Sequence, residues 1–362
     1  MQIIADRHAL HKIPELHKDL PETTAYLEKA LEGLGCQVFS PGGEGLCAWF
    51  DFGKESAIAF RADMDALPIA EKTGAAYAST HEGKMHACGH DGHMAILLEL
   101  ARRLSGKKDL PHNVLLVFQP AEETTGGARD ICETGVFEEK KVEAIFGLHL
   151  WPGMEAGVVF SREQELMARS CEVTVDVYGK SAHIAKAAEG VDALMAGADF
   201  YREAVQLERE VPEGIYRLLK FGKFHSGTVR NALSAHTHME GSLRAFQDEV
   251  FEGLVEGLRA RAEAVSARYG CHVNLHFSDG YPAVMNPSPL FARVKKAVNF
   301  REIAEPFMTA EDFSWYQKRL PGMFFFLGLG DGPALHADNF DFDEQILVKG
   351  ADFFEELAEN FL

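Results

Sequence analysis

The stretch Val114-Leu115-Leu116-Val117-Phe118-Gln119-Pro120-Ala121-Glu122-Glu123 decides the fold. Its first five residues form a continuous apolar run with β-branched side chains, which predicts a strand covered on both faces. Residues 57–60, 144–148 and 320–330 predict further buried strands, and residues 93–104 predict an amphipathic helix. Strands that alternate with helices predict an α/β fold with a mixed, mostly parallel sheet flanked by helices.

The pattern changes after about residue 165, where strands with one exposed face begin. Because the chain is too long for one ordinary domain, a second domain is expected. The elements predicted over 171–178, 191–207, 216–224, 235–245, 248–269 and 273–277 follow the order β-α-β-β-α-β, the ferredoxin-like arrangement. We therefore predict an α+β domain over residues 166–280 that is inserted into a first domain, residues 1–165 and 281–362.

The composition is that of an acidic globular protein. The 362 residues are 46% hydrophobic, and 36 Lys+Arg against 55 Asp+Glu give a net charge of −19. Such a surface repels nucleic acid and anionic membranes, so neither is expected as a partner. Residues 320–330 are too few to span a bilayer, which needs about 20 residues. The N-terminal residues lack the apolar core of a secretory signal, so we expect a cytoplasmic protein with free cysteines.

Residues of the kinds that bind metals follow four of the predicted strands, and a fifth group precedes the helix over 93–104. In open α/β sheets the functional crevice lies outside the carboxyl ends of the strands, so these groups are expected to converge. Thiolate, imidazole and carboxylate together suit Zn²⁺ and neighbouring divalent ions. The residues are Asp63 and Asp65, Glu122 and Glu123, His149, His336, and the stretch Met85-His86-Ala87-Cys88-Gly89-His90-Asp91-Gly92-His93.

Each of these groups has an ordinary alternative explanation when taken alone. His149 is compatible with a hydrogen-bonded histidine at the rim of a sheet, and Glu122-Glu123 with a solvated acidic pair. However, two carboxylates beside Pro120, directly after a fully apolar strand, are unusual for a surface. The joint pattern therefore favours a metal site.

At these residues the sequence resembles the dinuclear-metal aminoacylase and carboxypeptidase family (peptidase clan MH). The resemblance is to its amidohydrolase subfamily, with hippurate hydrolase, auxin-conjugate amidohydrolases and N-acetyldiaminopimelate deacetylase. The stretch His86-Ala87-Cys88-Gly89-His90-Asp91 is its most specific part. The other matching stretches are Arg7-His8-Ala9-Leu10-His11, Arg61-Ala62-Asp63-Met64-Asp65, Gln119-Pro120-Ala121-Glu122-Glu123, Gly147-Leu148-His149, Gly179-Lys180-Ser181-Ala182-His183, Gly227-Thr228-Val229-Arg230-Asn231, Glu311-Asp312-Phe313 and Leu335-His336.

The resemblance implies a catalytic first domain with two divalent metal ions per subunit, Zn or Mn, with Co or Ni as alternatives. Cys88 would bridge the ions, His90 and His149 would complete one site, and Glu123 and His336 the other. A hydroxide between the metals would attack an amide, because a metal lowers the pKa of bound water to about 7. Glu122 would act as general acid/base, since a carboxylate that accepts the water proton can return it to the leaving amine. Asp63 and Asp65 are expected to support the ligands rather than bind metal.

For the inserted domain, the resemblance implies a lid and a homodimer formed through that lid. His183 would stabilise the oxyanion, Asn231 would reach the substrate, and Arg244 would bind a substrate carboxylate. From the sequence alone, a polar loop histidine is an alternative for His183, and a surface strand arginine is equally plausible for Arg244. Glu311 is expected to line the metal pocket. Lys186 stands where relatives carry a different sequence, and its charge suggests a preference for acidic substrates.

The expected function is hydrolysis of small-molecule N-acyl-L-amino acids to a carboxylate and a free amino acid. Alternatives are N-acetyldiaminopimelate deacetylase, a metallo-dipeptidase or carboxypeptidase, and a non-catalytic binding protein on the same fold. The remaining histidines are not expected to bind metal or substrate. We expect His86 and His93 to support the metal ligands. His8, His11, His17, His81 and His112 are predicted at the surface or as caps, and His225, His236, His238, His272 and His276 as structural.

Overall fold

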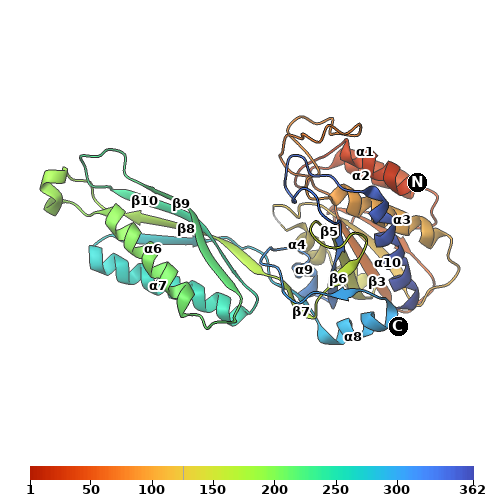
Figure 1. Cartoon of the computed structure of the whole chain (residues 1–362). Helices are drawn as coiled ribbons and strands as arrows, with labels where there is room; N and C mark the ends of the chain where they lie inside the picture. The colour runs from red at the N-terminus through yellow and green to blue at the C-terminus, as the bar shows by residue number, and fades with distance from the viewer. Residues whose placement is uncertain (125) are drawn as a thin grey trace. The chain divides into compact units, whose positions relative to one another are not determined.

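The computed structural model describes residues 1–124 and 126–362, which form two compact units. The first unit comprises Met1–Leu166, Val284–Glu305 and Asp312–Leu362, and the second comprises Met167–Ala283 and Pro306–Glu311 (Figure 1). The sequence assigned residues 306–311 to the first domain. They group with the second unit because Ala168 N donates to Phe307 O (3.1 Å) and Thr309 O (2.9 Å).

The first unit is built on an eight-stranded sheet in the order β1-β2-β4-β3-β5-β14-β6-β13. The four strands β4, β3, β5 and β14 are neighbours and run parallel, as the predicted fold class requires. Strands β3, β4 and β14 are buried along their whole length, which explains the apolar runs over residues 57–60, 114–118 and 323–327. The bounds are β1 Gln37–Phe39, β2 Leu46–Phe50, β3 Ala57–Asp63, β4 Asn113–Gln119, β5 Val142–Trp151, β6 Val159–Ser161, β13 Arg301–Glu302 and β14 Gly322–Gly328; β7 Gln164–Met167 pairs separately with β12 Val284–Asn286.

Helices cover both faces of this sheet. The predicted amphipathic helix is α3, and its apolar face packs with alternate strand residues such as Phe60, Phe118 and Phe146 in one large core. That face is shared by α1 Gln2–His11, α2 Pro21–Leu31, α3 His90–Ser105, α8 Ser288–Ala297 and α10 Leu347–Asn360. The short helices α4 Gly127–Glu133, α5 Val136–Glu139 and α9 Ser314–Gln317 contact β4, β5 and β14.

The second unit is a four-stranded antiparallel sheet in the order β11-β8-β10-β9 with two helices on one face (Figure 1). Its element order β8-α6-β9-β10-α7-β11 matches the expected ferredoxin-like order. The bounds are β8 Arg169–Tyr178, α6 Ala193–Glu210, β9 Arg217–Ser226, β10 His236–Ala245, α7 Asp248–Tyr269 and β11 His272–Phe277, with 3₁₀ turns at Ile184–Glu189 (η1) and, in the first unit, Glu344–Ile346 (η2). None of the helices in the described part of the chain is long and apolar enough to cross a membrane.

Candidate metal and catalytic centre

The carboxyl ends of the parallel strands bring the predicted ligand groups together in the first unit. Cys88 lies in the loop before α3, and Gly89, at φ 87°, turns the chain so that the helix begins at His90. The loop after β14 joins the same place, because His336 N donates to Ala87 O at 2.8 Å. Segments that are far apart in the sequence therefore meet at one edge of the sheet, as that arrangement of strands predicts.

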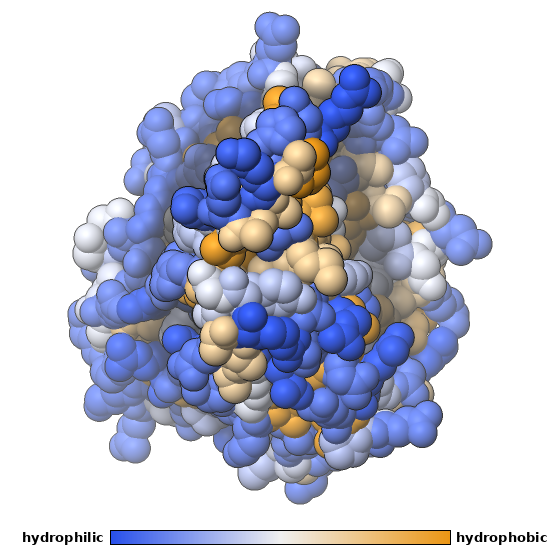
Figure 2. All heavy atoms as spheres, turned by 90° about the vertical axis from the view of Figure 1, so that its left-hand side faces the viewer, coloured by the Kyte–Doolittle hydropathy of each residue, from blue (hydrophilic) through white to orange (hydrophobic). Residues whose placement is uncertain are grey.

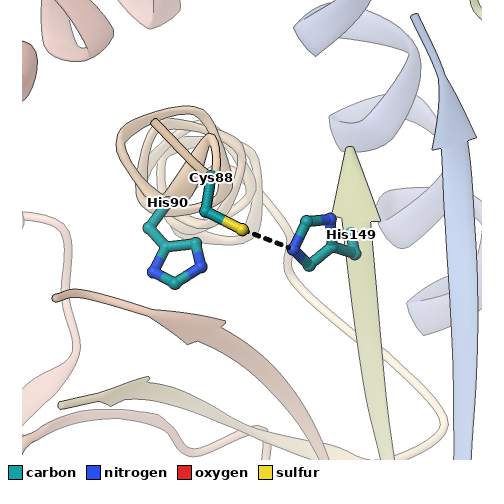
Figure 3. Close-up of side chains that lie close together, drawn as sticks. All are labelled: Cys88, His90 and His149. Carbon is teal, nitrogen blue, oxygen red and sulfur yellow. Dashed lines mark hydrogen bonds between the residues drawn. The ribbon is translucent and has the colours of Figure 1, made fainter. Parts of the chain in front are cut away.

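The Cys88 thiol is the centre of this cluster. Its sulfur lies 3.4 Å from His149 Nε2 (Figure 3) and 3.3 Å from His336 Nε2. Two groups of metal-type ligand atoms share this thiol, one with His90 and His149 and the other with Glu123 and His336. The structure thus brings together all five residues that the sequence proposed as metal ligands.

Backbone carbonyl groups orient two of the imidazole rings. His90 Nδ1 donates to Asp65 O, and His149 Nδ1 donates to Leu150 O, both at 2.7 Å. A carbonyl oxygen only accepts, so Nδ1 carries the proton and Nε2 presents its lone pair to the cluster. Fixing a ligand histidine through its other nitrogen is typical of metal sites.

The adjacent glutamates are positioned by Asp65. Its two carboxylate oxygens accept the backbone N–H groups of Glu122 (2.9 Å) and Glu123 (3.1 Å). The preceding residue, Ala121, has a φ of 58°, and His336 has a φ of 65°, although neither is glycine. Such conformations cost energy and persist where the surrounding structure holds them, which is frequent at functional sites.

Asp63 supports the histidines of the cluster. It lies at the end of β3, where its Oδ1 is 2.5 Å from His93 Nδ1 and its Oδ2 is 3.6 Å from His90 Nε2. His93 Nε2 in turn accepts Leu150 N at 2.9 Å, so this ring is held from both sides. Burial opposes ionisation of Asp63, but His90, Arg61 and His93 hold the pKa of this carboxyl well below its usual value.

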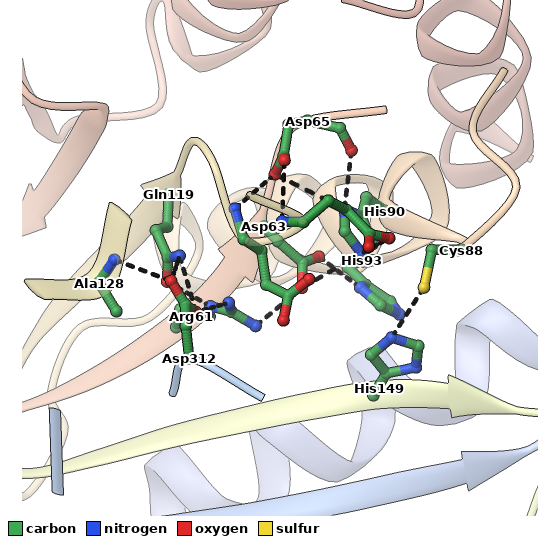
Figure 4. Close-up of polar contacts among 12 residues, drawn as sticks. Arg61, Asp63, Asp65, Cys88, His90, His93, Gln119, Ala128, His149 and Asp312 are labelled. Carbon is green, nitrogen blue, oxygen red and sulfur yellow. Dashed lines mark hydrogen bonds and ion pairs between the residues drawn. The ribbon is translucent and has the colours of Figure 1, made fainter. Parts of the chain in front are cut away.

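Arg61 belongs to a buried polar network that the sequence interpretation missed. Its guanidinium donates to Asp63 (2.7 Å), Asp312 (2.8 Å) and Gln119 (2.7 Å) within the buried part of the first unit (Figure 4). Asp312 also accepts Ala128 N at 3.1 Å. The signal was present in the sequence, because a charged residue directly after an apolar run that predicts a buried strand needs buried partners of opposite charge.

His11 and His112 were predicted at the surface or as caps, and a surface position was wrong for both. His11 is fully buried, and its Nδ1 lies 2.7 Å from Asp91 Oδ2, which also accepts Arg7 Nε at 3.1 Å. Helix α1 packs against α3, and this contact buries polar side chains of α1. The sequence of α1 alone does not show which of its faces is buried. His112 is 8% exposed and lies 3.0 Å from Ser56 Oγ.

The donor set of the cluster fits divalent transition-metal ions. His90 Nε2 is buried without a hydrogen-bond partner among the described residues, which is costly for a polar atom unless an ion binds it. Burial, with Glu123 and Glu122 nearby, raises the pKa of the Cys88 thiol well above its usual value. A cation would reverse that effect, because a coordinating thiol is deprotonated.

The other predicted site residues lie in the second unit. His183 is exposed and caps η1, where its Nδ1 accepts Ala185 N at 3.1 Å. Asn231 is its neighbour, because Ile184 N donates to Asn231 O at 3.0 Å. Arg244 Nη1 donates to Met308 O at 2.6 Å. Glu311 is the last residue of this unit and is 1% exposed.

Comparisons with known proteins agree with these observations. Residues 59–360 match the model of peptidase family M20/M25/M40. An uncharacterized hydrolase of Staphylococcus haemolyticus is 34% identical, with 98% of this chain and 97% of the relative covered.

Two solved structures are similar over almost the whole chain. A proposed aminohydrolase from methicillin-resistant Staphylococcus aureus has a TM-score of 0.91 at 29% identity, covering 99% of this chain and 96% of that one. The Bacillus subtilis YXEP protein, described as a dinuclear metal binding peptidase, has a TM-score of 0.86 at 31% identity with the same coverage. The chain therefore belongs to peptidase family M20/M25/M40 and is a hydrolase of amide or peptide bonds.

Proposed function

We propose that the protein hydrolyses the amide bond of N-acyl-L-amino acids and uses two divalent metal ions held by Cys88, His90, His149, Glu123 and His336. The observation that carries the proposal is the shared Cys88 thiol, which lies between His149 Nε2 and His336 Nε2. A thiolate between two sets of ligands suits a paired site. Zn or Mn, with Co or Ni as alternatives, is compatible with these ligands, and cellular supply contributes to the choice.

Glu122 is the proposed general acid and base. When bound, the ions supply Lewis acidity that polarises an amide carbonyl and activates water. The Glu122 carboxylate would accept a proton from that water and return it to the leaving amine. Asp65 fixes the backbone of both glutamates by accepting their N–H groups. The Glu123 side chain is then directed to the ligand cluster, where its Oε1 lies 3.2 Å from His336 Nε2, and this contact supports a ligand role for Glu123 rather than for Glu122.

In the second unit we assign substrate roles to four residues. His183 would stabilise the oxyanion, and Asn231 would bind the substrate. Arg244 would bind a substrate carboxylate through the guanidinium donors that Met308 O and Ser242 Oγ do not occupy. Glu311 would shape the pocket. Replacing His183 by Ala should lower kcat with little change in metal content, which separates a transition-state role from a ligand role.

The decisive experiment is a matched pair of glutamate variants. Glu122→Gln should lose at least about 1000-fold in kcat and keep its metal, while Glu123→Gln should lose metal. Loss of metal from Glu122→Gln alone would show that the two roles are exchanged. Removal of metal by a chelator should abolish turnover, and re-addition should restore it.

A substrate panel tests the amide class. N-acetyl, N-benzoyl and N-succinyl amino acids, with N-acetyldiaminopimelate and dipeptides included, distinguish a general deacylase from the deacetylase and peptidase alternatives. Hydrolysis of dipeptides alone would contradict the proposal. Absence of hydrolysis of every compound by metal-loaded protein would contradict it as well.

We further propose a homodimer formed through the second unit. Among the described residues, every exposed large hydrophobic side chain other than the two terminal residues lies in this unit, and they include Leu194 (49%), Met195 (54%) and Val229 (58%). Figure 2 shows hydrophobic side chains gathered on the face turned to the viewer, with hydrophilic ones around them. Such patches mark interaction sites. Light scattering should give the mass of two chains, and Met195→Glu should shift it toward one.

A further inference from the structure

One face of the second unit's sheet carries an unusual number of histidines. Val175 of β8 and Met239 of β10 point into the core with α6 and α7, so their neighbours along each strand point the other way. The strand register places the outward residues of β8 and β10 beside those of β9 and β11. Five of the 16 histidines of the chain share this outward face: His225, His236, His238, His272 and His276.

Two of these histidines meet a carboxylate at one point. His236 and His238 are two residues apart on β10 and point the same way, and Asp176 lies opposite His238 on β8. His236 Nε2 and His238 Nδ1 lie 2.7 and 2.9 Å from the same oxygen, Asp176 Oδ1. One ligand atom from each of the three residues lies within 4.8 Å of the other two.

Neighbouring side chains orient both rings. Glu240 Oε1 lies 2.8 Å from His238 Nε2 and 2.7 Å from Lys223 Nζ. When Nε2 keeps its proton for Glu240, Nδ1 presents its lone pair toward Asp176, which is the usual arrangement of a ligand histidine and its supporting carboxylate. The Tyr178 ring stacks on the His236 ring, with centroids 5.0 Å apart and an angle of 17°.

Charge and access also suit a small cation. Asp176 and Glu240 carry two negative charges against the single positive charge of Lys223, and imidazole is neutral when it binds a metal. His236 and His238 line a hollow of about 630 Å³. The Asp176 side chain is itself 20% exposed, so an ion can reach all three residues and water can complete its coordination.

We propose that Asp176, His236 and His238 bind a third divalent transition-metal ion, which shares no ligand with the Cys88 cluster. Two imidazoles and one carboxylate suit Zn²⁺ and its neighbours rather than Mg²⁺ or Ca²⁺. Bonds of about 2.0–2.1 Å in a tetrahedral site require ligand atoms about 3.3 Å apart. The present separations of 2.7 and 2.9 Å need only a small opening of surface side chains to reach that value.

The test is metal binding to the full-length protein by equilibrium dialysis against zinc chloride, with bound zinc measured by elemental analysis. Wild type should bind one zinc per chain more than His236→Ala or His238→Ala. Glu240→Gln should weaken this additional zinc by about 10- to 100-fold, because it removes the group that orients His238. His276→Ala is the matched control, since it removes a histidine from the same face and should leave zinc content unchanged.

Two results would overturn the proposal. The first is equal zinc content in wild type, His236→Ala and His238→Ala. The second is an equal loss in His276→Ala, which would mean that the histidine face binds zinc without a defined site. The absorption spectrum of the Co²⁺-loaded protein gives a second measurement. The proposed site contains no sulfur, so wild type and His238→Ala should show the same thiolate-to-metal band although His238→Ala binds one Co²⁺ fewer.

Discussion

Asp65→Asn tests whether one buried carboxylate positions Glu122, the proposed general acid and base, and its neighbour Glu123. Asparagine has nearly the same shape but offers one oxygen and one NH₂ group in place of two oxygens. The oxygens of Asp65 accept N–H groups of Glu122 at 2.9 Å and Glu123 at 3.1 Å, so one of these donors would face another donor. A buried donor without a partner costs about 1–3 kcal/mol.

If this cost appears in the activation free energy because Glu122 is no longer held in place, kcat should fall by about 5- to 150-fold, since about 1.4 kcal/mol corresponds to a tenfold change in rate. We expect KM to change little. The assay is hydrolysis of the best substrate of the panel at equal metal content. Asp51→Asn is the matched control, because Asp51 also accepts a backbone N–H, from Gly53 at 2.8 Å, in an exposed turn where water can replace it. A kcat for Asp65→Asn within threefold of the Asp51→Asn value would refute this reasoning.

Three further predictions concern the packing of the first unit and the specificity of the second. Arg61→Leu should lower the free energy of unfolding by about 3–5 kcal/mol in denaturant titrations, because it removes the buried positive charge that faces the Asp63 and Asp312 carboxylates. Arg103→Leu removes three ion pairs at a more exposed position and should cost less than about 1 kcal/mol; equal losses would contradict the role of burial. Gly147→Ala should destabilise the protein by about 1–3 kcal/mol, since its Cβ would lie 2.7 Å from the Phe324 ring, and unchanged stability would contradict the close packing of β5. Lys186→Ala should lower kcat/KM for N-succinyl relative to N-acetyl substrates by about threefold, the size expected of an exposed charge; an unchanged ranking would remove the suggested preference for acidic groups.

Much of the fold was predictable because its central strands carry local signals. The apolar run over 114–118 is a strand buried on both faces, and the alternation over 171–178 is a strand with one exposed face. Convergence of the ligand residues was predictable as well, since parallel strands end at one edge of the sheet. The grouping of residues 306–311 with the second unit was not predictable, because it depends on backbone bonds to Ala168.

The environments of individual polar residues were the least predictable part. His11 lies in a helix of mixed polarity, and only the packing of α1 on α3 buries it beside Asp91. The histidines of the second unit's sheet carried no local signal for convergence. His236 and His238 meet Asp176 because strand register pairs β10 with β8, and register is a property of the sheet.

By itself the sequence determined the class of chemistry, since thiol, imidazole and carboxylate groups after buried strands favour a transition-metal site. It also determined the succession of strands and helices, because both follow from local periodicity. Only the tertiary structure decided which atoms meet. Cys88 lies beside His149 and His336, which are 61 and 248 residues away in the chain. Distances between such residues depend on how whole strands and helices pack, and no local pattern contains them.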